Sequence, residues 1–507
     1  MRDIGGTVRI WGNAGVALLS VLSLALAAGG CGEGEHSGGS TRNEASWLAP
    51  NGDAANHRRA TSAIDAASVG RLGVAWRLPL SALYAATPIV RDGVVYTQDL
   101  MSNVYAVELA SGRLRWRHDY NEVDIGPNGV AVVGGKVFGA TASRAFALDA
   151  ETGRELWTTT LAHHEGDTID MAPGYARGTV YVSTAVSGIG AVGTLWALDA
   201  DTGKPRWRWR QVPEGLWGHP EVNSGGGLWH PPAFGDDGAL YVSTGNPLPF
   251  PGVDRWAWGS SRPGENRWTN TIAKLDPDSG RVLWAHQVLA HDIFDWDLEG
   301  PVILDRVDGR PLALTAGKMG IVYAFDAERG RLVWRRSVGL HNGHDHDNLA
   351  AQRGRAPFEE PTKVLPGWWG GVETQMASDG RTLYVPVNDL ATVYDGAGER
   401  LTPPDPAAGT GRVVAIDIAS GRILWDRLLP RSPYGAATIA NDLVFTTTYD
   451  GTVWALARTD GRVVWRTRLR AGTNAPVVLA GDTLIAAASV PTQTQGPELV
   501  AYRLGGD

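Results

Sequence analysis

LWALDADTGKPRW, from Leu195 to Trp207, is the stretch of sequence that decides the fold. Its side chains alternate between two faces from Leu195 to Asp199, with the period of a β-strand, and a DADTG turn leads into a second strand that ends on Trp207. Gly203 supplies the positive φ that closes a short loop, and Asp199 can accept hydrogen bonds from the loop amides. The stretch is therefore predicted to be a β-hairpin.

The same unit occurs seven times along the chain, and each copy ends in a tryptophan. The other copies are VYAVELASGRLRW (Val104 to Trp116), AFALDAETGRELW (Ala145 to Trp157), IAKLDPDSGRVLW (Ile272 to Trp284), VYAFDAERGRLVW (Val322 to Trp334), VVAIDIASGRILW (Val413 to Trp425) and VWALARTDGRVVW (Val453 to Trp465). Their turn glycines lie 40 to 91 residues apart. The short intervals suit four-stranded propeller blades, and the long ones indicate blades with inserted loops.

An eighth blade is predicted from the two ends of the repeat region. The last segment supplies inner strands but no closing tryptophan, whereas VAWRLPL near the start carries Trp76 with no hairpin before it. If this N-terminal strand completes the last blade, the ring has no free edge. The sequence therefore predicts an all-β, eight-bladed β-propeller in which most of the 21 tryptophans are structural.

Composition and charge narrow the class of protein. The 507 residues carry a net charge of −8, 65 glycines and 29 prolines, with no basic cluster. These values agree with a loop-rich β-domain and argue against nucleic acid as a partner.

The N-terminal region is typical of an exported lipoprotein. Residues 1–30 have the positive start, apolar run and small residues of a signal peptide, and Cys31, the single cysteine, follows directly. A cysteine at this place resembles the bacterial lipobox, where the thiol receives a lipid that anchors the protein to the membrane. The alternative is an ordinary secretory signal that leaves a free thiol. Residues 31–70 are predicted to be a tether and lead-in, and residues 71–507 the propeller.

The repeat spacing, the ALDAxTGxxxW unit and the lead-in from Ser46 to Trp76 together resemble the eight-bladed quinoprotein alcohol dehydrogenases. That family uses pyrroloquinoline quinone (PQQ) with calcium or a lanthanide. The repeat is also found in non-enzymatic propellers, so by itself it predicts fold and not activity.

Three blocks resemble the family's active-site segments. GGGLW followed by YVSTGNPLPF implies that Trp229 lies under the quinone, or packs or stacks on a sugar, and that Asn246 ligates the metal. HDIFDWDLEG implies Asp295 as the catalytic base and Asp297 as an additional metal ligand; a solvated acidic loop is the alternative. LTAGKMG implies that Lys318 contacts the quinone oxygens and stabilises the negative charge that develops there.

Other positions depart from the family pattern. Gly188 stands where a metal-binding glutamate is expected, Asn128 where an arginine grips a cofactor carboxylate, and Asp170 where a hydroxyl residue is expected. Asn128 and Asp170 are therefore expected beside the cofactor but make the pocket less favourable to an anion. The chain also lacks the adjacent-cysteine disulfide of many alcohol dehydrogenases.

Two further segments carry candidate binding residues. His341, His344 and His346 lie in LHNGHDHDN, which predicts either a transition-metal site or, in the simpler interpretation, an exposed polar loop. PGWWGGVE places tryptophans 368 and 369 at one mouth of the ring and offers Glu373 as a substitute metal ligand.

The resemblance implies an exported dehydrogenase that oxidises an alcohol or sugar hydroxyl with PQQ and a calcium or lanthanide cation. Because the sequence has no CxxCH motif, electrons would pass to a separate cytochrome or quinone. The alternative hypothesis is a non-catalytic envelope lipoprotein, similar to an outer-membrane assembly factor, that binds protein or glycan through tryptophan-rich loops on its top face.

Overall fold

The computed structural model describes residues 45–186 and 188–506, and the regular secondary structure of this part of the chain is almost entirely β-strand. The short helices η1 (Val69–Arg71), η2 (Leu216–Gly218), η3 (Ala257–Gly259) and α1 (Asp347–Gln352) lie in connections. No helix within these described ranges has the length and apolar character needed to span a membrane. The predicted signal peptide and the predicted lipidation of Cys31 fall on residues outside the described ranges, so both stay predictions.

Eight sheets, each with four antiparallel strands, form the propeller blades of the described chain, and in blade 7 a fifth strand is added in parallel, β1 (Arg59–Ala60). Blades 1 to 4 are β3 (Ile89–Arg91), β4 (Val94–Gln98), β5 (Val104–Glu108) and β6 (Leu114–His118); β7 (Ala131–Val133), β8 (Lys136–Ala140), β9 (Arg144–Asp149) and β10 (Glu155–Thr160); β12 (Gly174–Ala176), β13 (Thr179–Ser183), β15 (Thr194–Asp199) and β16 (Pro205–Arg210); and β18 (Ala233–Phe234), β19 (Leu240–Ser243), β21 (Thr271–Leu275) and β22 (Val282–Gln287). Blades 5 to 8 are β23 (Ile303–Val307), β24 (Arg310–Gly317), β25 (Ile321–Asp326) and β26 (Leu332–Ser337); β28 (Ala377–Ser378), β29 (Thr382–Asp389), β32 (Thr410–Asp417) and β33 (Ile423–Leu429); β34 (Thr438–Ala440), β35 (Leu443–Thr447), β36 (Thr452–Ala457) and β37 (Val463–Arg468); and β38 (Val478–Ala480), β39 (Thr483–Ala488), β40 (Glu498–Leu504) and β2 (Leu72–Pro79). The predicted fold class is confirmed.

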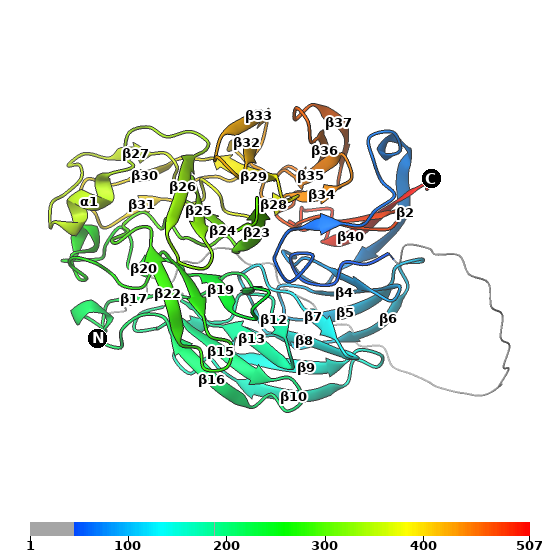
Figure 1. The fold of residues 1–507 in the computed structure, drawn as a ribbon, viewed down its shortest axis with the longest axis horizontal. Helices are drawn as coiled ribbons and strands as arrows, with labels where there is room; N and C mark the ends of the chain where they lie inside the picture. The colour runs from blue at the N-terminus through cyan, green and yellow to red at the C-terminus, as the bar shows by residue number, and fades with distance from the viewer. Residues whose placement is uncertain (1–44, 187, 507) are drawn as a thin grey trace. The chain divides into compact units, whose positions relative to one another are not determined.

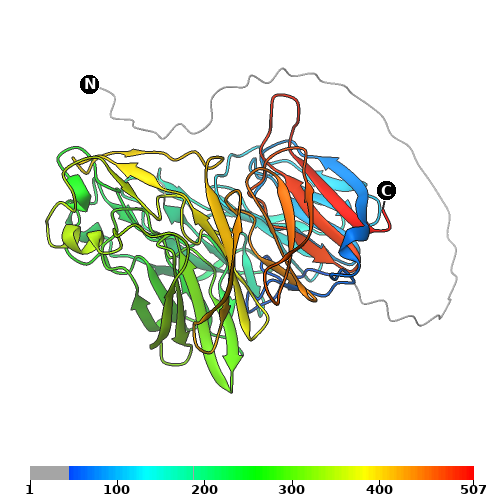
Figure 2. The same ribbon diagram turned by 90° about the horizontal axis from the view of Figure 1, so that it is seen from above.

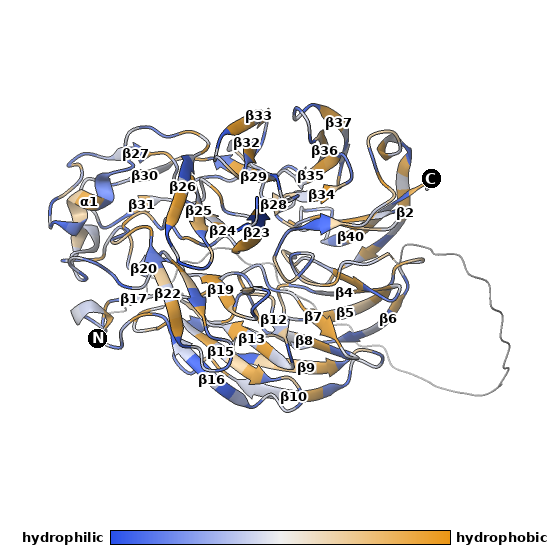
Figure 3. Cartoon of the chain, viewed as in Figure 1, coloured by the Kyte–Doolittle hydropathy of each residue, from blue (hydrophilic) through white to orange (hydrophobic). Residues whose placement is uncertain are grey.

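The blades are arranged around a centre, with their last strands outermost. Figure 1 shows β6, β10, β33 and β37 at the rim and β7, β28 and β34 towards the middle. Strands are coloured mainly apolar and many connecting loops hydrophilic in Figure 3. Buried side chains of neighbouring blades form shared hydrophobic clusters, such as Val95 of blade 1 with Val137 of blade 2 and Ile485 of blade 8. The core therefore lies between the sheets.

The N-terminal strand closes the ring. β2 pairs antiparallel with β40, from Leu72 opposite Leu504 to Pro79 opposite Glu498. The last blade is thus built from both ends of the described chain, as the sequence predicts, and neither β40 nor β39 is left with an unpaired edge.

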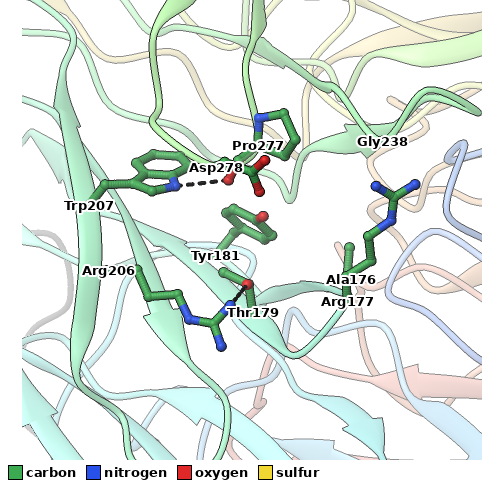
Figure 4. Close-up of a pocket in the computed structure, with 9 residues that line it drawn as sticks. All are labelled: Ala176, Arg177, Thr179, Tyr181, Arg206, Trp207, Gly238, Pro277 and Asp278. Carbon is green, nitrogen blue, oxygen red and sulfur yellow. Dashed lines mark hydrogen bonds between the residues drawn. The ribbon is translucent and has the colours of Figure 1, made fainter.

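Six of the seven repeat tryptophans, and also Trp76, dock onto the hairpin turn of the next blade. Figure 4 shows one such joint, where the Trp207 indole nitrogen donates to the carbonyl of Pro277 at 2.9 Å. The Cβ of any other residue at Gly280 would lie 2.5 Å from the Trp207 ring, so only glycine allows this contact. Six further joints repeat it, with Trp76 on Gly112, Trp116 on Gly153, Trp157 on Gly203, Trp284 on Gly330, Trp334 on Gly421 and Trp425 on Gly461. Each of these repeats therefore forms the outer hairpin of its own blade and also fixes the contact of that blade with the next one.

Residues 47–64 of the lead-in cross from blade to blade. Backbone amides of blades 4, 5, 6 and 7 donate to the carbonyls of Ala54, Ala55, His57 and Arg58. β1 (Arg59–Ala60) pairs in parallel with β34 of blade 7. The lead-in is therefore packed against much of the ring.

The longest interval of the repeat contains an added three-stranded sheet. β27 (Thr362–Val364) pairs with β30 (Thr392–Tyr394), which pairs with β31 (Leu401–Thr402). Figures 1 and 2 show this sheet with α1 at the left edge, beyond blades 4 and 5. We call residues 338–376 and 390–409 the insertion.

Candidate active site

Four residues that the sequence singles out meet at one place. Asn246 follows β19, Asp295 and Asp297 lie between β22 and β23, and Lys318 follows β24. The Lys318 ammonium lies 2.8 Å from Asp295 Oδ2 and 2.9 Å from Asp297 Oδ2. Asn246 donates to the same two acids, from its side-chain Nδ2 to Asp295 Oδ1 and from its backbone N–H to Asp297 Oδ1, both at 2.6 Å. The contacts tie blades 4 and 5 into one polar cluster.

Two more acids belong to this cluster. The sequence offers Glu373 only as a substitute metal ligand and gives no role to Glu299. Glu299 Oε2 lies 3.7 Å from the Lys318 ammonium, and Glu373 is close enough to raise the pKa of Glu299. Glu299 lies in the HDIFDWDLEG block, two residues after Asp297. In an extended segment this spacing would direct both side chains to the same side, and it is the sequence feature from which Glu299 could have been predicted.

Burial and charge set the protonation of the cluster. Burial raises the pKa of Asp295 and Glu299 well above their usual range and that of Glu373 to about 7, while Lys318 opposes each shift. Burial alone would lower the pKa of Lys318, but the surrounding carboxylates raise it well above its ordinary value. Four acids thus surround one ammonium, which leaves the site short of positive charge.

The half-buried Trp229 lies beside this cluster. A Cβ at Gly245 would be 3.5 Å from Trp229 Nε1 and 2.9 Å from Asp297 Oδ1, so the glycine separates the indole from the acids without filling the space. Trp229 is not one of the docking tryptophans. Its predicted stacking role stays a prediction, and its position beside the acids agrees with it.

Asn128 and Asp170 are held in a different group. Asp124, which was not predicted, joins them: burial and Asp170 raise its pKa, and Asn128 opposes that shift. Asn128 also donates to the carbonyl of Asp99 at 2.9 Å, and Asp170 accepts from Thr168 at 2.5 Å. Burial raises the pKa of Asp170 as well. This pair of buried acids does not suit an anionic group, so their predicted contact with the cofactor remains a prediction.

Gly188 cannot be replaced by the expected glutamate without a backbone shift, because a Cβ there would lie 2.5 Å from the Cα of Gly166.

The histidines of the insertion do not form one cluster, because two of them pair with separate acids, His341 with Asp345 at 2.8 Å and His344 with Asp347 at 2.7 Å. In residues 45–186 and 188–506, no three or more His, Cys, Asp or Glu side chains form a ready metal-binding group. The polar-loop interpretation of the histidines is therefore favoured.

Aromatic rings stand near the cluster. Trp368 and Trp369 stack with ring centroids 4.8 Å apart, and Phe250 lies 5.9 Å from Trp368. The Tyr434 hydroxyl donates to the carbonyl of Trp369, and Glu373 helps to raise the pKa of Tyr434 well above its usual range after burial itself. The two tryptophans and the phenylalanine remain partly exposed, as expected for the mouth of a site.

Two surface cavities contain none of the predicted residues. One, of about 110 Å³, lies at the Trp207 joint and is lined by Arg177, Arg206 and Asp278 among others (Figure 4). The other, of about 200 Å³, is lined by His163, Trp196 and Arg208 among others. Neither is part of the acidic cluster, and the chemistry of the cluster makes it the better candidate site.

The acids of the cluster are not arranged as a ready metal-binding group, with Lys318 between Asp295 and Asp297, but the cluster still offers oxygen atoms to a hard cation. Glu299 Oε1 and Glu373 Oε2 are buried oxygens that accept no hydrogen bond in the described part of the chain. Carboxylate and amide oxygens are the ligands that calcium and lanthanides prefer, and additional positive charge would compensate the excess of acids. The indole of Trp229 and the Lys318 ammonium supply a flat face and a donor for a quinone, whereas the acids at 124 and 170 do not fit its carboxylates.

Comparison with known proteins shows the family. The model described as "Outer membrane protein assembly factor BamB" matches residues 100–226 and 318–506, more than half of the chain. The model described as "Glucose/ethanol/alcohol dehydrogenase, beta-propeller domain" matches residues 169–338. Residues 227–317, with Trp229, Asn246, Asp295 and Asp297, are matched by the dehydrogenase model only.

Similar proteins of known activity are also quinoprotein dehydrogenases. Quinohemoprotein alcohol dehydrogenase ADH IIB of Pseudomonas putida is 30% identical over 83% of this chain and 70% of its own length. Quinohemoprotein alcohol dehydrogenase of Comamonas testosteroni is 30% identical over 83% and 68%. Lanthanide-dependent methanol dehydrogenase of Methylacidiphilum fumariolicum is 25% identical over 84% and 81%.

Solved structures confirm the fold. Quinohemoprotein alcohol dehydrogenase ADHIIG of Pseudomonas putida superposes with a TM-score of 0.80 at 24% identity, covering 92% of this chain and 81% of that one. BamB of Moraxella catarrhalis gives 0.54 at 15% identity, with coverages of 85% and 97%. The comparisons confirm the predicted enzyme class, a quinoprotein dehydrogenase-like oxidoreductase, and support PQQ with a calcium or lanthanide cation as its cofactors. The chain belongs to the family of PQQ-dependent alcohol dehydrogenase-like β-propellers.

Proposed function

We propose that this protein is a dehydrogenase that oxidises the hydroxyl group of a small alcohol or sugar. The observation that carries the proposal is the contact of Asn246 and Lys318 with both Asp295 and Asp297. When bound, PQQ with a cation would supply the hydride acceptor. The side chains of the protein would carry out the other steps of the oxidation.

In this proposal Asp295 takes the proton of the substrate hydroxyl. The neighbouring Lys318 ammonium opposes the rise in the pKa of Asp295 and offers a donor to oxygen atoms that gain negative charge. Asn246, Asp295 and Asp297 would hold the cation, and Glu299 and Glu373 would supply carboxylate charge in place of the glutamate missing at Gly188. Trp229 would offer its indole face to the quinone.

The partly exposed Phe250, Trp368 and Trp369 provide an apolar wall for the substrate body. A separate cytochrome or quinone receives the electrons. Export and attachment to the membrane through a lipid on Cys31 complete the proposal and place the reaction in the cell envelope.

The matched region of the assembly-factor model favours one other function, a scaffold that binds envelope proteins or glycans without catalysis. That model leaves out residues 227–317, where most of the polar cluster lies. Because a scaffold has no need of four buried acids around one lysine, the enzyme is the better explanation.

Activity of the protein supplied with PQQ and calcium or lanthanide tests the function. Asp295→Asn should lower dye-linked alcohol oxidation by about 10²- to 10⁴-fold, the usual contribution of a general base. Asp237→Asn, which changes an exposed acid paired with Lys274 in blade 4, is the control and should keep full activity. An Asp295→Asn variant as active as the control would refute the role of Asp295. No retention of PQQ in equilibrium dialysis would favour the scaffold.

A further inference from the structure

Asp295 has a backbone conformation that other residues must enforce. Its φ is +61°, in the left-handed region that residues with a side chain rarely adopt. Such a conformation costs about 1–3 kcal/mol and persists only where the surroundings fix it. The groups that hold the residues next to Asp295 therefore decide where its carboxylate lies.

One set of restraints comes from the same segment. The Asp292 carboxylate accepts hydrogen bonds from the amides of Phe294, at 2.9 Å, and Trp296, at 2.7 Å. Arg262, which is fully buried, donates to the carbonyl of Asp292 at 2.6 Å. These bonds shape the turn but leave the Ile293 amide and the Phe294 carbonyl to be satisfied from elsewhere.

The insertion supplies both missing partners. Asn348, in α1, accepts a hydrogen bond from the Ile293 amide through Oδ1 at 2.9 Å. Tyr394, at the end of β30, donates from its hydroxyl to the Phe294 carbonyl at 3.0 Å, and its ring packs 4.9 Å from the Phe294 ring. The two bonds end on the two residues directly before Asp295.

Both insertion residues are inside the protein. Asn348 is 2% exposed and Tyr394 0%. Tyr394 is near enough to the site that Asp295, after burial, contributes to raising its pKa. The side chains of Ile293, Phe294 and Trp296 share a hydrophobic cluster with Tyr394 and Val364 of the insertion sheet. The insertion thus packs directly on the strained segment.

We propose that the insertion is a positioning element for the active site and that Asn348 and Tyr394 are its positioning residues. They fix the backbone at 293 and 294, so that Asp295 keeps its left-handed conformation and its carboxylate stays at Lys318 and Asn246. The inference rests on the proposed function of Asp295, but its structural part stands independently. It also gives the insertion a role that its histidine cluster does not provide.

The test compares two tyrosines that make the same kind of bond. Tyr394→Phe removes only the hydroxyl bond to Phe294. Tyr241→Phe is the control, because the Tyr241 hydroxyl is likewise buried and donates to a backbone carbonyl, that of Ala327, at 3.0 Å in the joint between blades 4 and 5. Asn348→Ala is the second test variant. We would measure kcat, KM and the hydrogen exchange of a peptide covering residues 290–297 in each full-length protein.

Tyr394→Phe and Asn348→Ala are expected to lower kcat about 10- to 100-fold, as a misplaced catalytic group does, with KM changed far less. They should also speed exchange in the 290–297 peptide, whereas Tyr241→Phe changes neither. Equal kcat and equal exchange in Tyr394→Phe and Tyr241→Phe would overturn the proposal. If the unaltered protein oxidises no alcohol, the proposed function fails but the exchange data still decide whether the insertion holds the segment.

Discussion

At the scale of single residues, His57 shows how one side chain ties the lead-in to the ring. Its Nδ1 lies 2.8 Å from Asp53 Oδ2, and its Nε2 lies 2.8 Å from the carbonyl of Leu304 and 3.2 Å from Asp305 Oδ1. Burial lowers the pKa of His57, but the bonds to Asp305 and Asp53 outweigh it and raise the pKa to about 10. The charged imidazolium therefore joins the lead-in to blade 5.

This shift predicts a pH-dependent contribution to stability. Because the folded-state pKa lies above the unfolded value near 6.5, the stabilisation is complete below about pH 6.5 and is lost as the pH rises towards 10. His57→Gln should therefore lower the free energy of unfolding by about 2 kcal/mol at pH 6, the value of a hydrogen bond to a charged group, and by less near pH 10. Urea unfolding at both pH values measures it. An equal loss at pH 6 and pH 10 would contradict the prediction.

In the candidate active site, the role of Lys318 depends on the acids around it. Lys318 contributes through its surroundings, since an ammonium among four acids is fixed in both place and charge. The sequence blocks predicted that Lys318 would share one spot with Asp295 and Asp297, but not that its ammonium would contact both carboxylates directly.

At the scale of elements, the hairpin and its tryptophan dock form the repeated unit. The Trp284 indole donates to the carbonyl of Ala327 at 3.1 Å, and a Cβ at Gly330 would lie 2.6 Å from the Trp284 ring. The turn of blade 5 is therefore shaped for a side chain of blade 4.

Gly330→Ala should destabilise the protein more than a matched glycine change. Gly309, in the turn between β23 and β24 of the same blade, also has a positive φ, but a Cβ there meets nothing within 4 Å. Gly309→Ala should cost about 1 kcal/mol for the backbone alone, and Gly330→Ala about 1–3 kcal/mol more, because the methyl group overpacks against Trp284. Thermal unfolding of the two variants gives the difference. Equal melting temperatures would show that the dock tolerates a methyl group.

At the scale of the whole molecule, the ring is held closed by non-covalent pairing of its two ends. β2 and β40 pair over the whole length of the blade, and Trp76 of β2 docks on Gly112 of blade 1. Removing β2 would therefore open two contacts at once, the sheet of blade 8 and its joint with blade 1.

Truncation tests this closure. Deleting residues 1–79 removes β2 and the lead-in and should leave the edge of β40 exposed, so that the protein unfolds at much lower temperature or aggregates. Deleting residues 1–44 keeps both and is the control, which should melt as the full chain does. Scanning calorimetry and size-exclusion chromatography distinguish the outcomes. A monomeric 80–507 protein with an unchanged melting temperature would show that closure by β2 is dispensable.

Much of the fold could be predicted from the sequence because the information is local. The alternation of side chains, the Gly of each turn, the Asp of most turns and the closing Trp lie within about a dozen residues of one another, so each hairpin can be predicted from its own short segment. The unmatched Trp76 and the final strands without a closing tryptophan likewise indicated the shared eighth blade. Asn246, Asp295, Asp297 and Lys318 were found by resemblance to family blocks.

The rest could not be predicted, because it depends on which distant segments meet. Asn128 and Asp170 stand at positions where the family resemblance predicts contacts with the cofactor, but in the structure they pack with Asp124. Glu299 and Glu373 join Lys318 although 74 positions separate them in the sequence.

By itself, the sequence determined the repeated hairpin, the number of blades, the way the ring closes and four of the side chains at its polar cluster, since short-range patterns and motif blocks encode these. Only the tertiary structure decided that the acids surround Lys318, that Asp295 adopts a strained backbone, and that Asn348 and Tyr394 hold it there. The physical reason is that these hydrogen bonds join groups 21 to 100 residues apart in the sequence, which only the folded ring brings together and no local pattern records.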